Sequence, residues 1–210
     1  MRFNSFHNFL RKETHLLYGI VALLLTACAL LPKTEVPIET GRVDCEATWL
    51  RENADESKDI AFFLKLEKSQ FKINEPIFST LVLKNISSVP LWVNKRMIVN
   101  RPSLGDAGEV YFVIISPWGE TADLIAKVDA MAPIAQDFVL LEPQQTIETQ
   151  SEGIMLYSYL SLWRPERKNI DLHGKYCAWA VYHNQTDPGL DGFVWKGSIK
   201  SNYVEFEIIK

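Results

Sequence analysis

The stretch FKINEPIFSTLVLKNISSVPLWV, residues 71–93, decides the fold class of this chain of 210 residues. Within it, Leu81 and Leu83 alternate with polar or branched neighbours, which is the two-residue period of a strand with one buried face. The polar run from Asn85 to Pro90 is typical of a turn. A second apolar run, Leu-Trp-Val, follows directly. The stretch therefore predicts two strands joined by a short turn.

The same pattern of short apolar runs separated by turn residues continues along the chain from residue 59. We expect strands at residues 62–66, 71–76, 77–86, 91–93, 97–99, 109–116, 138–141, 154–157, 176–183, 193–195 and 203–209. Residues 109–116 are apolar on both faces, which is typical of a strand inside a sheet. A short helix is expected around Ala47 to Asn53, and residues 121–131 fit either a helix or a strand and loop. This pattern predicts an all-β, antiparallel β-sandwich in one domain.

Residues 71–93 resemble a recurring pattern of bacterial immunoglobulin-like domains, which the bacterial intracellular proteinase inhibitor family carries. The pattern joins a Glu-Pro turn, an alternating strand ending in Asn, a polar turn and a Pro-aliphatic strand. Residues 141–146, 174–182 and 195–208 resemble its later parts, with Gln144 where glycine is usual. The resemblance implies a single immunoglobulin-like β-sandwich at residues 59–210, and it concerns fold more than function.

The amino terminus combines a basic region with twelve largely apolar residues, the length of a signal-peptide core and too short to span a bilayer. The residues that follow, Leu25-Thr26-Ala27-Cys28, resemble the lipobox of bacterial lipoproteins. The alternatives are an ordinary secretory signal and an uncleaved anchor. The resemblance implies a lipoprotein signal peptide at residues 1–27 and a lipidated Cys28, followed by a tether and N-terminal extension over residues 28–58. Because Ala29 follows the cysteine, it also implies the outer membrane if the host is Gram-negative.

Cys45 and Cys177 are the thiols that remain once Cys28 is acylated. In an oxidising envelope two remaining cysteines commonly pair, so we expect a disulfide between them. The alternative is that Cys177, on the strand face of Trp179 and Val181, is a buried small apolar residue.

Composition and motifs exclude several function classes. A net charge of −4 gives no basis for nucleic-acid binding. Downstream of Cys28 the chain has the histidines His173 and His183 and no nucleophile-elbow or zinc-protease motif. Asp171 and His173 form a possible acid–imidazole pair, but a polar loop is the simpler interpretation, and a Cys177–His183 dyad would be too widely spaced. We therefore expect neither catalysis nor a cofactor.

The segment Asp187-Pro-Gly-Leu-Asp191 carries two carboxylates in a glycine-bearing loop, and carboxylate oxygens are common ligands of calcium. It lacks the dense acidic spacing of a calcium loop, so a turn between strands is expected and no metal site is assigned.

The tryptophans divide into two groups. Trp92, Trp179 and Trp195 fall in strand patterns and are expected in the core. Trp118 and Trp163 lie beside prolines in less regular segments, where they either pack at the edge of the core or contact a partner.

Together these observations predict a membrane-anchored, non-enzymatic module that binds another protein of the cell envelope. One alternative is a proteinase inhibitor, for which residues 102–108 are the candidate loop. The other is an envelope enzyme or a carbohydrate or ligand binder that uses Asp171 and His173.

Overall fold

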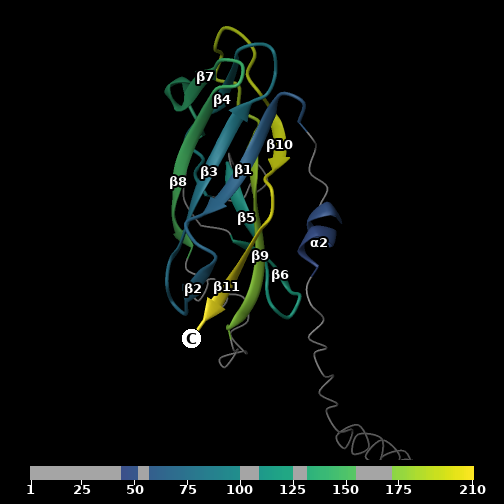
Figure 1. Cartoon of the computed structure of the whole chain (residues 1–210). Coiled ribbons are helices and arrows are strands. Elements are labelled where there is room, and N and C mark those ends of the chain that lie inside the picture. The colour runs from purple at the N-terminus through teal and green to yellow at the C-terminus, as the bar shows by residue number, and fades with distance from the viewer. Residues whose placement is uncertain (1–43, 52–56, 100–108, 125–131, 155–171) are drawn as a thin grey trace, which may run out of the picture. The chain divides into compact units, whose positions relative to one another are not determined.

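The computed structural model describes residues 44–51, 57–99, 109–124, 132–154 and 172–210, and these residues form an all-β fold with one short α-helix (Figure 1). The helix is α2 (Cys45–Arg51) and a 3₁₀ turn, η1, covers Ala135–Asp137. The strands are β1 (Ile60–Leu66), β2 (Gln70–Lys72), β3 (Ile77–Asn85), β4 (Leu91–Asn94), β5 (Val110–Ile115), β6 (Thr121–Leu124), β7 (Phe138–Leu141), β8 (Thr146–Ile154), β9 (Gly174–Asn184), β10 (Gly197–Lys200) and β11 (Val204–Ile209).

The strands form three sheets. Sheet A has the order β1-β3-β8, sheet B has the order β2-β11-β9-β5-β6 with β10 also paired to β9, and sheet C joins β4 to β7. Every pairing is antiparallel except that of β2 with β11, which is parallel. The prediction of an antiparallel all-β fold is confirmed.

Asn85, the last residue of β3, connects sheet A to sheet C by hydrogen bonds. The main chain of Asn85 makes two hydrogen bonds with the β7–β8 turn. Asn85 N donates to Gln145 O at 3.0 Å, and Asn85 O accepts from Gln144 N at 2.9 Å. Its fully buried side-chain amide donates to Val89 O and Leu141 O, both at 2.9 Å. The Asn85 side chain therefore holds the loop at residues 86–90 against β7.

The main core joins side chains from all three sheets. Its buried members include Phe62 and Leu81 of sheet A, Leu91 of sheet C, and Phe112 and Tyr182 of sheet B. Because neighbouring side chains point to opposite faces of a strand, β5 and β9 send alternate residues into this core and into a second cluster. That second cluster contains Cys45, Val113, Ile115, Cys177, Trp179 and Val181. The prediction that residues 109–116 are buried on both faces is confirmed.

Several predicted boundaries were wrong. Residues 97–99 and 193–195 are not strands, although each makes one isolated bridge, Val99 with Val110 and Val194 with Trp92. Of the predicted strand at residues 154–157, Ile154 belongs to β8 and residues 155–157 lie outside the described residues. Most of β8 and all of β10 were missed. Residues 121–124 form β6, and residues 125–131 lie outside the described residues. Polar residues dominate β8 and β10, so their sequences lack an apolar period.

The predicted signal peptide, Cys28 and the tether lie outside the described residues. Within the described part of the chain, none of the helical structure has the length and apolarity needed to span a bilayer.

Candidate functional site at the two ends of strand β9

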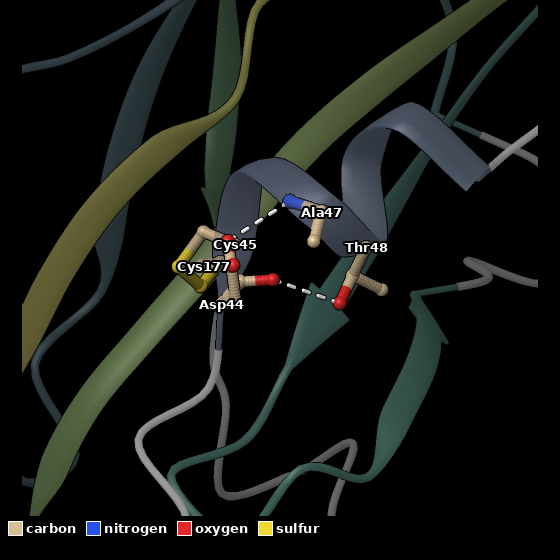
Figure 2. The surroundings of a disulfide bond; sticks show 5 residues. All are labelled: Asp44, Cys45, Ala47, Thr48 and Cys177. Carbon is tan, nitrogen blue, oxygen red and sulfur yellow. Dashed lines mark hydrogen bonds between the residues drawn. A yellow bond between two sulfur atoms is a disulfide. The ribbon is translucent and has the colours of Figure 1, made fainter.

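A disulfide between Cys45 and Cys177 attaches helix α2 to strand β9, with the two Cα atoms 5.8 Å apart (Figure 2). The helix begins at Asp44, whose Oδ1 accepts a hydrogen bond from Ala47 N at 2.9 Å, an N-cap that satisfies a free amide of the first turn. Thr48 Oγ1 donates to Asp44 O at 2.9 Å. The expected pairing of the two cysteines is thus present, on a helix that begins two residues before the predicted one.

Helix α2 covers the outer face of sheet B. The indole of Trp49 donates to Ser201 O at 2.8 Å and packs beside Tyr203, with 6.0 Å between ring centroids. The ammonium of Lys200 lies 4.3 Å from the centre of the Trp49 ring and donates to Trp49 O at 2.8 Å. These contacts and the disulfide cover the second apolar cluster. The chain segment that precedes the first strand therefore packs on the domain at the Cys177 half of β9.

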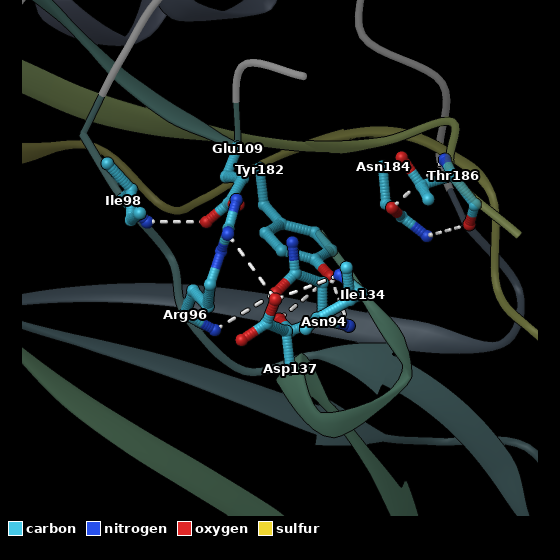
Figure 3. A network of polar contacts seen from close by, with 9 residues as sticks. All are labelled: Asn94, Arg96, Ile98, Glu109, Ile134, Asp137, Tyr182, Asn184 and Thr186. Atoms are coloured by element: carbon cyan, nitrogen blue, oxygen red, sulfur yellow. Dashed lines mark hydrogen bonds and ion pairs between the residues drawn. The ribbon is translucent and has the colours of Figure 1, made fainter. Parts of the chain in front are cut away.

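The other end of β9 is held by a buried polar network (Figure 3). Tyr182 Oη accepts a hydrogen bond from Asn94 N at 3.0 Å and donates to Asn94 O at 3.1 Å, which joins β9 to β4. Burial raises the pKa of Tyr182, so its hydroxyl stays protonated and available as a donor. Asn94 Nδ2 is buried and has no hydrogen-bond partner among the described residues.

An ion-pair cluster lies beside this contact. Arg96 Nε donates to Glu109 Oε1 at 2.7 Å, Arg96 Nη2 contacts the same oxygen, and Arg96 Nη1 lies 3.3 Å from Asp137 Oδ2. Glu109 is only 1% exposed, and its Oε2 accepts from Ile98 N at 2.8 Å. Asp137 Oδ2 also accepts from Ile134 N at 2.9 Å. These carboxylates hold η1, β5 and the chain after β4 together, and the sequence analysis did not find them.

Exposed apolar side chains gather around this network. We call the end of the domain formed by residues 86–90, sheet C, residues 132–137 and residues 185–196 the loop end (Figure 1). It carries five of the nine large exposed hydrophobic residues of the described chain, namely Ile86, Val89, Ile134, Leu140 and Phe193. Cys177 and Asn184 are seven residues apart on β9, which is ~23 Å in an extended strand. The loop end is thus well separated from the disulfide.

His173 and His183 do not form a shared site. His173 precedes β9, and Asp171, its predicted partner, lies outside the described residues. His183 is near the opposite end of β9, where its Nδ1 lies 2.6 Å from Ser198 Oγ on β10. Partial burial lowers the pKa of His183, because the charged imidazolium loses hydration. The two imidazoles are thus held at opposite ends of one strand.

The Asp187–Asp191 segment forms a turn in which the Asp187 carboxylate is engaged within the domain. Asp187 Oδ2 pairs with Lys196 Nζ at 2.9 Å and its Oδ1 accepts from Gly189 N at 3.0 Å, and the Lys196 bond chiefly lowers the pKa of Asp187. The backbone carbonyl of Asp191 accepts from Trp92 Nε1 at 2.9 Å. Across the described residues, no group of three or more His, Cys, Asp or Glu side chains is placed to hold a metal ion.

A surface groove of about 790 Å³ lies beside β2, lined by residues that include Lys68, Lys72, Glu75 and Ile209. Glu75 pairs with Lys68 and accepts from Lys72 N at 2.7 Å, and these bonds lower the pKa of Glu75. The Glu75 carboxylate therefore stabilises the β2–β3 turn.

The tryptophans partly follow the prediction. Trp179 and Trp195 are buried, as predicted, whereas Trp92 is only half-buried because it lies on the outer face of sheet C. Trp118 is half-buried and packs edge-on against Tyr176, with ring centroids 6.5 Å apart. Trp163 and the predicted inhibitory loop at residues 102–108 lie outside the described residues.

No protein-family model matches this chain, and no curated protein matches it either.

Proposed function

We propose that the protein is a lipid-anchored bacterial lipoprotein whose immunoglobulin-like β-sandwich is a non-catalytic module that binds another protein of the cell envelope. The lipobox-like Leu25-Thr26-Ala27-Cys28 supports the anchor. The packing of sheets A, B and C around one core supports a sandwich. In a Gram-negative host the module belongs to the outer membrane, facing the periplasm or the cell surface.

One observation carries the binding role: β9 has a covalent attachment at one end and exposed apolar residues at the other. The disulfide fixes the preceding chain at Cys177. Ile134, Leu140 and Phe193 lie at the loop end and are between 38% and 54% exposed. Exposed apolar groups that gather on one part of a surface mark protein interaction sites. The exposed apolar residues thus lie at the end of β9 opposite the disulfide, where the attachment of α2 leaves them uncovered.

The charged groups in and beside the loop end favour binding over catalysis. Arg96 contacts Glu109 and Asp137, and Lys196 pairs with Asp187. A nucleophile or general base needs a reacting partner within hydrogen-bond reach. In this region the carboxylates instead hold strands and turns in place.

Crosslinking in native cells tests the binding role. The full-length lipoprotein carries p-benzoylphenylalanine in place of Ile134 or Phe193, with Leu50 and Phe63 as comparison positions on other surfaces. We expect one dominant protein adduct from the loop-end positions. The absence of any protein adduct from all four positions would refute the proposed role. Cys28→Ser tests the anchor separately, since it should abolish labelling by radioactive palmitate.

Proteinase inhibition is a second candidate because the residues that precede and follow the predicted inhibitory segment, residues 102–108, are hydrogen-bonded to each other. Val99 bridges Val110, and Val110 N donates to Ile98 O at 3.0 Å. An inhibitory loop needs such a fixed base, since preorganisation lowers the cost of binding. Inhibition of at least one bacterial protease at micromolar concentration of the purified domain would support this candidate, and a negative result across a broad panel would exclude it.

A further inference from the structure

The directions of the main-chain groups of β4 identify an unpaired strand edge at the loop end. Trp92 N donates to Phe193 O at 2.8 Å, and Trp92 O accepts from Trp195 N at 3.0 Å. The amide and carbonyl of Trp92 therefore point away from β7. Directly opposed residues of an antiparallel ladder alternate between hydrogen-bonded and non-hydrogen-bonded pairs. Trp92 and Leu140 are opposed, so theirs is a non-hydrogen-bonded pair.

It follows that the N–H and C=O of Leu140 point outward, toward the free side of β7. Phe138, two residues earlier, also points outward, and its N–H is bonded to Ala135 O. Among the described residues, no backbone or side-chain group pairs with the main chain of Leu140. The outer edge of β7 thus presents a donor and an acceptor in extended geometry, a ready template for another strand.

The two edge strands of sheet A, β1 and β8, carry features that protect them. On β1, the side chain of Asn202 occupies the outer edge, since Leu64 N donates to Asn202 Oδ1 at 3.0 Å and Asn202 Nδ2 donates to Leu64 O at 3.1 Å. The edge strand β8 carries Glu148, which is paired with Lys65 of β1 at 3.6 Å. Side chains that occupy an edge, and charged residues on an edge strand, are means by which proteins prevent unwanted strand pairing. By contrast β7, with the sequence Phe-Val-Leu-Leu, carries no charge.

The side chains around the β7 edge are apolar. Leu140 is 38% exposed and Ile134, which precedes η1, is 54% exposed. The half-buried Trp92 lies opposite Leu140 across sheet C. Strand addition draws affinity from main-chain hydrogen bonds and specificity from alternate side chains. An extended segment with apolar residues at alternate positions would pair with the free main-chain groups of Leu140 and would also contact the apolar side chains around this edge.

We infer that the outer edge of β7 is the docking site for an extended segment of the envelope partner, which adds to sheet C as a further strand through the main chain of Leu140. This inference rests on the proposed binding role and names the surface and the form of partner that role requires.

The test uses the full-length lipoprotein with p-benzoylphenylalanine at position 134, in native cells. Leu140→Pro removes the outward N–H together with the leucine side chain, and edge positions tolerate proline because that amide is not part of the ladder. Leu140→Ala keeps the main chain and removes the side chain. Leu140→Lys places a charge at the edge and serves if the proline variant does not fold. Phe63→Ala, on the outer face of sheet A, is the matched control.

We expect a single hetero-protein adduct whose yield falls at least tenfold in Leu140→Pro and Leu140→Lys, falls less in Leu140→Ala, and is unchanged in Phe63→Ala. An undiminished adduct in the folded proline and lysine variants overturns the strand-addition site, as does an adduct that forms only when p-benzoylphenylalanine replaces Phe63 instead of Ile134. Either result leaves the proposed binding role intact. An adduct with a second copy of the chain also overturns the inference. The absence of adducts from every position overturns the binding role itself.

Discussion

Cys45 and Cys177 are 132 residues apart in the sequence, yet their Cα atoms lie 5.8 Å apart across a disulfide. The bond joins a seven-residue helix to the interior strand β9, which pairs with β5, β10 and β11. A helix of this length is not stable in isolation. The disulfide and the packing of Trp49 on Lys200 and Tyr203 therefore keep α2 in place.

Replacing both cysteines should destabilise the domain substantially. In the chain-entropy model a loop of this length contributes ~5 kcal/mol, and native disulfides typically contribute about 2–5 kcal/mol. We expect a loss in that range for Cys45→Ser combined with Cys177→Ser, measured by urea unfolding. Limited proteolysis should then cleave near α2, which loses its covalent attachment. A loss below about 1 kcal/mol, with unchanged proteolysis, would show that the non-covalent contacts of Trp49 are sufficient.

Removing Arg96 should be costly because it leaves Glu109 buried without its cation. Breaking one partner of a buried ion pair typically costs about 3–5 kcal/mol, so we expect ~3 kcal/mol for Arg96→Met. Glu109→Gln added to this variant should recover part of the loss, since a neutral amide needs no counter-ion. Lys65→Met, which breaks the exposed pair with Glu148, is the control and should change stability by less than about 1 kcal/mol. Equal effects of Arg96→Met and Lys65→Met in urea unfolding would contradict this account of the network.

The strands that sequence patterns identify are those with a strong apolar period. β3, β5 and β9 were predicted within a few residues because alternate or continuous apolar side chains fill the core. β8 was missed because its residues between Thr146 and Ser151 are polar at nearly every position, as the edge strand of sheet A permits. Hydrophobic periodicity reports burial, so a strand with little buried surface leaves little signal.

The candidate site was only partly predictable for a different reason. The pairing of Cys45 with Cys177 could be predicted across 132 residues because, once Cys28 is acylated, each of these cysteines has only the other as a disulfide partner in an oxidising compartment. The contacts among Asn94, Arg96, Glu109 and Asp137 join distant segments, and ordinary polar residues carry no such restriction. One signal was present: Glu109 directly precedes a strand with two buried faces, where an acid requires a partner. Its partner could not be identified without the pairing of strands.

Acidification should destabilise the domain through His183. Burial lowers the pKa of His183 in the folded state below its ordinary value of 6.5, which the unfolded chain retains. As the pH falls from about 7 to about 5, the unfolded state binds more protons at this position, so the free energy of unfolding decreases. His183→Gln should make urea unfolding less dependent on pH across this range. Identical pH dependence in the variant and the parent protein would rule out His183 as a source of the effect.

Amide hydrogen exchange should distinguish the two strand edges directly. The Leu64 amide is bonded to Asn202 Oδ1, whereas the Leu140 amide points to the unpaired side of β7. Exchange requires that an amide be free of hydrogen bonds, so Leu140 should exchange rapidly while Leu64, Val139 and Leu141 are protected. Asn202→Ala should remove the protection of Leu64 and cost about 2 kcal/mol, because two hydrogen bonds to the Leu64 main chain are lost at about 1 kcal/mol each. Protection of Leu140 equal to that of its two neighbours would mean that its amide is already paired. The docking edge inferred for β7 would then not exist in the free protein.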